Sequence, residues 1–133
     1  MRVRVFLYLL LWLALAQIAL ALVPIASSYI VDAHAGVGIA VVGLAHMNFA
    51  KLRRSRAPDR LKRIARATAI LATAQLALGL ALFAAFRLGV AVPGTEWIGF
   101  VHAIIALGIL AETASVATAH DMWEKAELGA GAP

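Results

Sequence analysis

The sequence contains no cysteine. A chain without thiols forms no disulfide, ligates no Fe–S cluster through cysteine and attaches no c-type haem. Charged residues are also scarce, at 14% of the 133 residues, whereas 63% are hydrophobic. Soluble domains average roughly 45–50% apolar residues, and a chain of this length has too little interior to bury more. The composition therefore predicts a single-domain integral membrane protein.

Acidic residues are few, and the basic residues are clustered. Of 12 lysines and arginines, two lie within the first four residues and eight lie between Lys51 and Arg66. Short basic segments beside apolar runs follow the positive-inside rule, so we expect segment 51–64 to be cytoplasmic. The clustering does not favour nucleic acid as a partner. We expect the chain to lie in a prokaryotic plasma membrane.

Four apolar segments are long enough to cross a bilayer, which takes about 20 residues. Alternation with a period of two residues is absent, so a transmembrane β-barrel is not expected. Short connections make neighbouring helices antiparallel, which predicts an all-α, up-down-up-down four-helix bundle over 1–133 with both termini cytoplasmic. The first apolar run is longer than a signal-peptide core, and we expect it to be retained. The expected spans are about 5–25, 33–50, 65–86 and 97–119.

The two halves of the chain resemble each other. Segment AQIALAL at 16–22 matches AQLALGL at 74–80, and each is followed by a span with an early histidine, His34 or His102. Each half is thus a helical hairpin, and two parallel hairpins are related by a pseudo-two-fold axis along the membrane normal. This symmetry predicts that the two histidines lie level with each other and face each other across the bundle.

Ionisable residues inside membrane spans are rare, and each is a candidate functional residue. A single such histidine is usually explained by a hydrogen bond to a neighbouring helix. Two symmetry-related imidazoles instead fit the two axial positions of a haem iron. We therefore predict one haem b with His34 and His102 as its iron ligands. Gly38 follows His34 by one helical turn and leaves room either for a porphyrin or for close helix packing.

Three further polar residues are candidates for contact with the cofactor. Gln17 and Gln75 lie in the middle of their spans, where hydrogen bonds between helices are favoured and contact with a ligand is the alternative. Arg87 lies at the outer end of the third span. It either pairs with the haem propionates or extends to the membrane interface.

A second haem on His46 and His120 is a less favoured alternative. His46 follows His34 by 12 residues, a rotation of about 120° around the helix. His120 follows His102 by 18 residues, which leaves the two lower histidines about 9 Å out of level. Glu112, a carboxylate deep in a span, lies near the depth of His46. A His46–Glu112 pair would satisfy both groups in lipid, as a structural contact or a proton path.

Two segments carry a resemblance to known families. DAHAGVGIAVVGLAH at 32–46 and GFVHAIIALGIL at 99–110, together with the two AQ runs, resemble four-helix membrane cytochromes of b type and one half of haem A synthase. The likeness covers roughly residues 5–118 and implies a haem-bearing bundle with ligands at His34 and His102. It also implies haem iron and electron transport.

Haem A synthase usually carries a glutamate four residues before a ligand histidine, where this chain has Ile30 and Ile98. That enzyme also has twice as many spans. Both differences favour a simple cytochrome over a synthase-like enzyme. The expected function is electron transfer with a quinol or another membrane redox partner. A quinone-linked oxidoreductase is the related enzymatic alternative. A second copy of the chain, forming a homo-oligomer, is the alternative partner. The non-redox alternative is an accessory subunit whose histidines only bond neighbouring helices.

Overall fold

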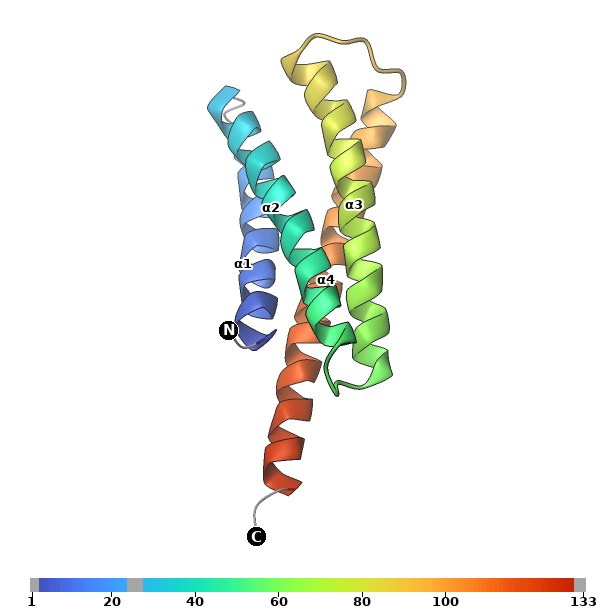
Figure 1. The fold of residues 1–133 in the computed structure, drawn as a ribbon. Helices are drawn as coiled ribbons and strands as arrows, with labels where there is room; N and C mark the ends of the chain where they lie inside the picture. The colour runs from blue at the N-terminus through green and yellow to red at the C-terminus, as the bar shows by residue number, and fades with distance from the viewer. Residues whose placement is uncertain (1–2, 24–27, 131–133) are drawn as a thin grey trace.

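The computed structural model describes residues 3–23 and 28–130, and in these residues it contains four helices and no strand. The helices are α1 (Val3–Ala21), α2 (Ser28–Arg53), α3 (Asp59–Arg87) and α4 (Thr95–Ala130). Each is long and apolar enough to span a membrane. The all-α four-helix bundle predicted from the sequence is therefore confirmed (Figure 1).

The helix ends differ from the expected spans for local reasons. Helix α1 ends at Ala21, close to Pro24, whose ring disfavours helical geometry in the residue before it. The expected end of the first span near Pro24 falls within 24–27, outside the described residues. Helix α3 begins at Asp59, directly after its N-cap Pro58, so several basic residues of segment 51–64 are helical. Helix α4 continues to Ala130, well beyond the expected span.

The helices form a ring in which each contacts its two neighbours. The backbones of α1 and α2, α2 and α3, α3 and α4, and α4 and α1 lie close together, whereas within the described residues no Cα atoms of a diagonal pair lie within 8 Å of each other. Helices α2 and α4, which carry His34 and His102, therefore lie diagonally opposite each other. A ligand at the centre of the bundle could reach both.

The tightly packed core occupies one half of the bundle. Its buried side chains lie on α1 up to Ala14, on α2 from Val41, on α3 up to Ala72 and on α4 from Ile109. Toward the α3–α4 loop no described residue is buried. Figure 1 shows the α1–α2 hairpin separating from the α3–α4 hairpin toward that same end. The bundle is thus closed at the end with the basic link and splayed at the other.

The two hairpins differ in length, and the second one is closed by the α3–α4 loop. This loop spans residues 88–94 and contains two glycines with left-handed backbone conformation, Gly89 at φ 65° and Gly94 at φ 71°. Glycine adopts this conformation without the steric cost of a Cβ atom. The glutamine-to-histidine spacing is 17 residues in one hairpin and 27 in the other. Most of this difference lies in α3, which continues 12 residues beyond Gln75, whereas α1 continues 4 residues beyond Gln17.

Candidate functional site

The splayed half of the bundle encloses a cavity of about 1150 Å³ lined by all four helices. This volume lies just above the range of roughly 300–1,000 Å³ typical of ligand sites. Among the described residues, the lining is apolar except for Thr95 and two Gln–His pairs, and it contains no charged side chain. Leu22 and Phe86 line the cavity and are largely exposed, so the cavity opens at the splayed end of the bundle.

His34 and His102 meet at this cavity. Their ring centroids are 6.2 Å apart and their planes are inclined at 50°. A histidine nitrogen ligates a first-row metal at about 2.0–2.1 Å, and the ring centre lies about 1.1 Å further away, so two imidazoles on opposite sides of one ion have centres roughly 6.2–6.4 Å apart. The observed separation of the ring centres therefore leaves room for one metal ion between the two imidazoles.

Hydrogen bonds to the described residues do not explain the position of the two histidine rings. The Nδ1 atoms of His34 and His102 are both buried and form no hydrogen bond with any described residue. A neutral imidazole always presents one nitrogen as an acceptor, and leaving a buried polar atom unpaired costs free energy. Two such rings line an apolar cavity, and each has a nitrogen that no described residue bonds. This arrangement fits the requirements of a metal-centred cofactor.

Two equivalent hydrogen bonds hold the histidine-bearing helix segments in place. Gln17 Nε2 donates to the backbone carbonyl of His34 at 2.7 Å, and Gln75 Nε2 donates to the carbonyl of His102 at 2.8 Å. The same contact thus occurs in both hairpins, which supports the internal repeat. It also confirms that the glutamines bond between helices. Both glutamines line the cavity as well, so each fixes a ligand helix at the edge of the site.

Replacing either glutamine by leucine is expected to destabilise the bundle only modestly. Hydrogen bonds between membrane helices contribute about 0.6 kcal/mol on average and at most about 1.7. Unfolding of Gln17→Leu, Gln75→Leu and the double variant in mixed detergent micelles measures this effect. The bonds lie in separate hairpins, so the two losses should add. A double variant that loses much more than the sum would contradict independent contacts.

Glycines make the close approaches around the histidines possible. A Cβ atom at Gly38 would lie 3.1 Å from Gln17 Nε2, and one at Gly79 would lie 3.1 Å from His102 Cε1. Gly38 was singled out from the sequence, whereas Gly79 was not. The signal for Gly79 was present in the repeat, where it is the one glycine of AQLALGL and aligns with Ala21. Only the structure shows that it faces the His102 ring.

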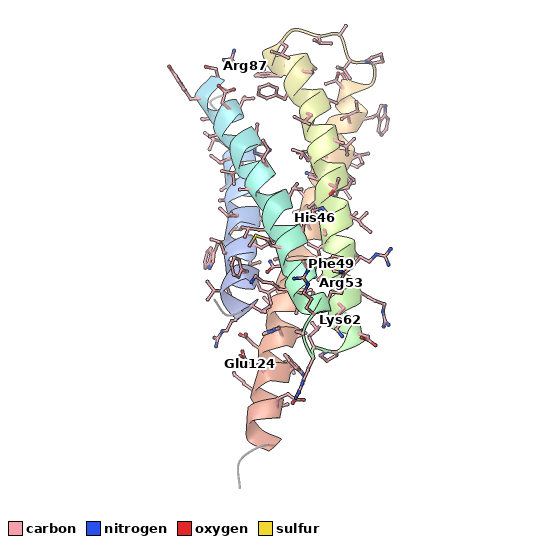
Figure 2. The ribbon with its side chains drawn as sticks, viewed as in Figure 1. His46, Phe49, Arg53, Lys62, Arg87 and Glu124 are labelled. Carbon is pink, nitrogen blue, oxygen red and sulfur yellow. The ribbon has the colours of Figure 1, made fainter. Side chains whose placement is uncertain are left out.

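Arg87 lies at the rim of the site rather than in its wall. Its Nε atom is 3.3 Å from Asp32 Oδ1, and both side chains are about half exposed, at 45% and 47%. The pair links the end of α3 to the start of α2 at the splayed end of the bundle, where Figure 2 labels Arg87. Arg87 does not line the cavity. Arg87 directly follows Phe86, which lines the cavity, so its guanidinium group lies near the cavity mouth. In the structure this group is paired with Asp32.

His46 and Glu112 do not form the pair considered from the sequence. His46 Nε2 lies 2.9 Å from Thr73 Oγ1, and Glu112 Oε2 lies 3.0 Å from Thr68 Oγ1. Helix α3 lies beside both α2 and α4 and offers a nearer partner to each group. Each polar group is satisfied by a threonine of α3 instead. The His46–Glu112 pair considered from the sequence is therefore not formed.

His46 and His120 also have separate surroundings. His46 is exposed beside Thr73, whereas His120 is buried and packs edge-on against Trp123, with ring centroids 5.5 Å apart. The structure gives these two histidines no common site. The 12-residue and 18-residue spacings place them at different depths, as the helical geometry indicates. The second haem considered from the sequence thus gains no support.

Comparison with known proteins adds no further assignment. The chain matches no protein-family model, no curated protein and no solved structure. The fold and the geometry of the site therefore carry the functional argument.

Proposed function

We propose that this protein is a membrane-embedded b-type cytochrome that binds one haem b between His34 and His102. The observation that carries the proposal is the 6.2 Å separation of two imidazole rings at the edge of a large apolar cavity. When bound, haem b supplies a one-electron couple at its iron. The protein's own contribution is to hold, orient and shield the cofactor.

Each part of the site has a definite task in this proposal. His34 and His102 would provide the axial ligands from diagonal helices. Gln17 and Gln75 fix the backbone that carries those rings through their hydrogen bonds to the two carbonyls. The apolar lining would exclude water from the porphyrin, and burial of this kind tunes the redox potential.

The non-redox alternative is less well supported by the contacts. An accessory subunit whose histidines only stabilise the bundle should have those rings bonded to neighbouring helices. His46 meets that description through Thr73, whereas the Nδ1 atoms of His34 and His102 have no partner among the described residues. We propose the electron donor and acceptor only by class. They are a quinol in the bilayer or another membrane redox partner.

The proposed orientation follows from charge. The basic link between α2 and α3 is at the closed end of the bundle, and the positive-inside rule assigns that end to the cytoplasm. Both termini would then be cytoplasmic, and the haem would lie near the outer face of a prokaryotic plasma membrane. Labelling of single cysteines introduced in the α2–α3 and α3–α4 links from each side of the membrane tests this topology.

A redox difference spectrum with haem quantification per chain tests the central proposal. Protein purified from cells supplied with haem should show the sharp α-band of low-spin haem b on reduction, at one haem per chain. A folded but colourless preparation would favour the non-redox accessory subunit. A stoichiometry of two would restore the second-haem hypothesis.

Arg87→Gln is expected to weaken haem retention by less than about tenfold, because an ion pair at a half-exposed position contributes about 1 kcal/mol or less. The reason is loss of the cation closest to the cavity mouth, where propionates would emerge. Asp32→Asn is the matched control, since it removes the partner but leaves Arg87 free. Haem dissociation rates measured by transfer to apomyoglobin compare the two. Equal weakening in both variants would show that Arg87 acts only through its pair with Asp32.

A further inference from the structure

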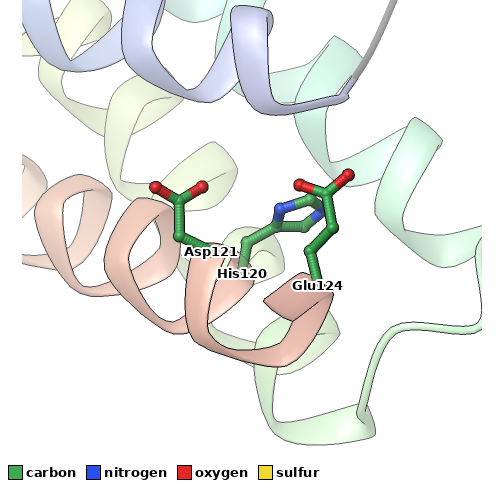
Figure 3. A group of neighbouring side chains, drawn as sticks. All are labelled: His120, Asp121 and Glu124. Carbon is green, nitrogen blue, oxygen red and sulfur yellow. The ribbon is translucent and has the colours of Figure 1, made fainter. Parts of the chain in front are cut away.

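A second group of candidate ligands lies on α4, on the opposite side of the packed core from the cavity. His120, Asp121 and Glu124 each offer one ligand atom, and these atoms lie within 4.8 Å of one another. Figure 3 shows the imidazole of His120 between the two carboxylates. His120 and Glu124 are four residues apart, so one helical face presents both.

The state of His120 points to a ligand rather than to ordinary packing. Its exposed fraction is 5%, and its Nδ1 atom forms no hydrogen bond with any described residue. Two carboxylates beside it supply no hydrogen-bond donor when ionised. The buried imidazole of His120 thus has an unpaired nitrogen and lies beside two acidic side chains. A metal ion would satisfy both the nitrogen and the carboxylates.

We propose that His120, Asp121 and Glu124 bind a divalent transition-metal cation of the Zn²⁺ type, separate from the haem site. One imidazole and two carboxylates form a ligand set that Zn²⁺ accepts, with water in a fourth position. Ligands at about 2.0–2.1 Å in tetrahedral geometry lie roughly 3.3 Å apart. Glu124 is only partly buried, so its side chain can rotate to shorten the distances between the ligand atoms.

Contacts from α1 shape this site. Tyr8 donates a hydrogen bond to Asp121 Oδ2 at 2.6 Å, and Arg4 Nε lies 3.3 Å from Asp121 Oδ1. Tyr8 orients the carboxylate, whereas Arg4 supplies a positive charge that competes with a metal cation. The Arg4 side chain is 55% exposed and can turn into solvent. A bound ion would be held by α4 alone, whereas Tyr8 of α1 would continue to orient Asp121 through its hydrogen bond.

Titration of the full chain with Co²⁺, in detergent and without a polyhistidine tag, tests the site. We expect one Co²⁺ per chain with ligand-field absorption, displaced by Zn²⁺. Co²⁺ should also quench Trp123, whose ring contacts His120. His120→Ala and Glu124→Gln should each weaken binding by about 100-fold or more, since loss of mere outer-shell partners already costs 10–100-fold. Glu127→Gln, an exposed carboxylate on the same helix, is the matched control and should bind normally.

Three further variants separate this proposal from the haem site and from surface binding. Arg4→Gln should tighten Co²⁺ binding by up to about tenfold, because it removes the competing charge. His34→Ala and His102→Ala should leave Co²⁺ affinity unchanged, whatever their effect on haem. Absence of Co²⁺ binding, or equal losses from Glu124→Gln and Glu127→Gln, would overturn the proposal.

Discussion

His102→Ala is expected to abolish the low-spin haem spectrum, and His34→Ala to do the same. The two rings are 6.2 Å apart, so each would supply one axial ligand and neither could replace the other. Removing an iron ligand should reduce haem affinity by about 100-fold or more, beyond the loss caused by an outer-shell change. Reduced-minus-oxidised spectra and haem per chain after purification measure the effect.

Added imidazole separates ligation from folding. A small imidazole can occupy the space left in His102→Ala and restore the low-spin spectrum, which an unfolded chain would not permit. His46→Ala is the matched control for His34→Ala, because both histidines lie on α2. Unlike His34, His46 contacts Thr73. Loss of the spectrum in His46→Ala to the same degree would show that the ligand assignment is wrong.

Gly79→Leu should eliminate haem binding without removing any polar group. A Cβ atom at this position lies 3.1 Å from His102 Cε1, so a larger side chain must displace the ring. Gly79→Ala is the graded variant, because a ring shift of a few tenths of an ångström accommodates one methyl group. It should weaken haem binding while the helix gains up to about 1 kcal/mol in intrinsic propensity. Opposite changes in haem affinity and apoprotein stability are the expected signature.

Gly43→Ala and Gly108→Ala are the controls for Gly79. A Cβ atom at either position meets nothing within 4 Å, so both variants have the gain in helix propensity without the contact. Their haem content should equal that of the wild type. If Gly79→Leu also retained full haem and an unchanged spectrum, the His102 ring could not occupy the position that the proposed site requires.

The class of fold and the main pair of site residues could be read from the chain itself. Apolar runs of spanning length depend only on local composition, and a bilayer admits few folds for them. The repeated Gln and His positions predicted two equivalent hairpins, and both Gln-to-carbonyl bonds are present. Periodicity was sufficient here because a helix fixes the depth and direction of each residue along its own axis.

Contacts between helices that the internal repeat does not relate were beyond the reach of that reasoning. The fates of His46 and Glu112 depended on α3, which lies beside both α2 and α4 and offers a threonine to each. The closeness of Gly79 to His102, the pairing of Arg87 with Asp32 and the grouping around His120 are of the same kind. The sequence by itself determined four apolar helices and the level of their polar groups, because these depend on local composition and helical rise. Only the tertiary structure decided which polar groups meet, because that depends on which helices are neighbours and which are diagonal.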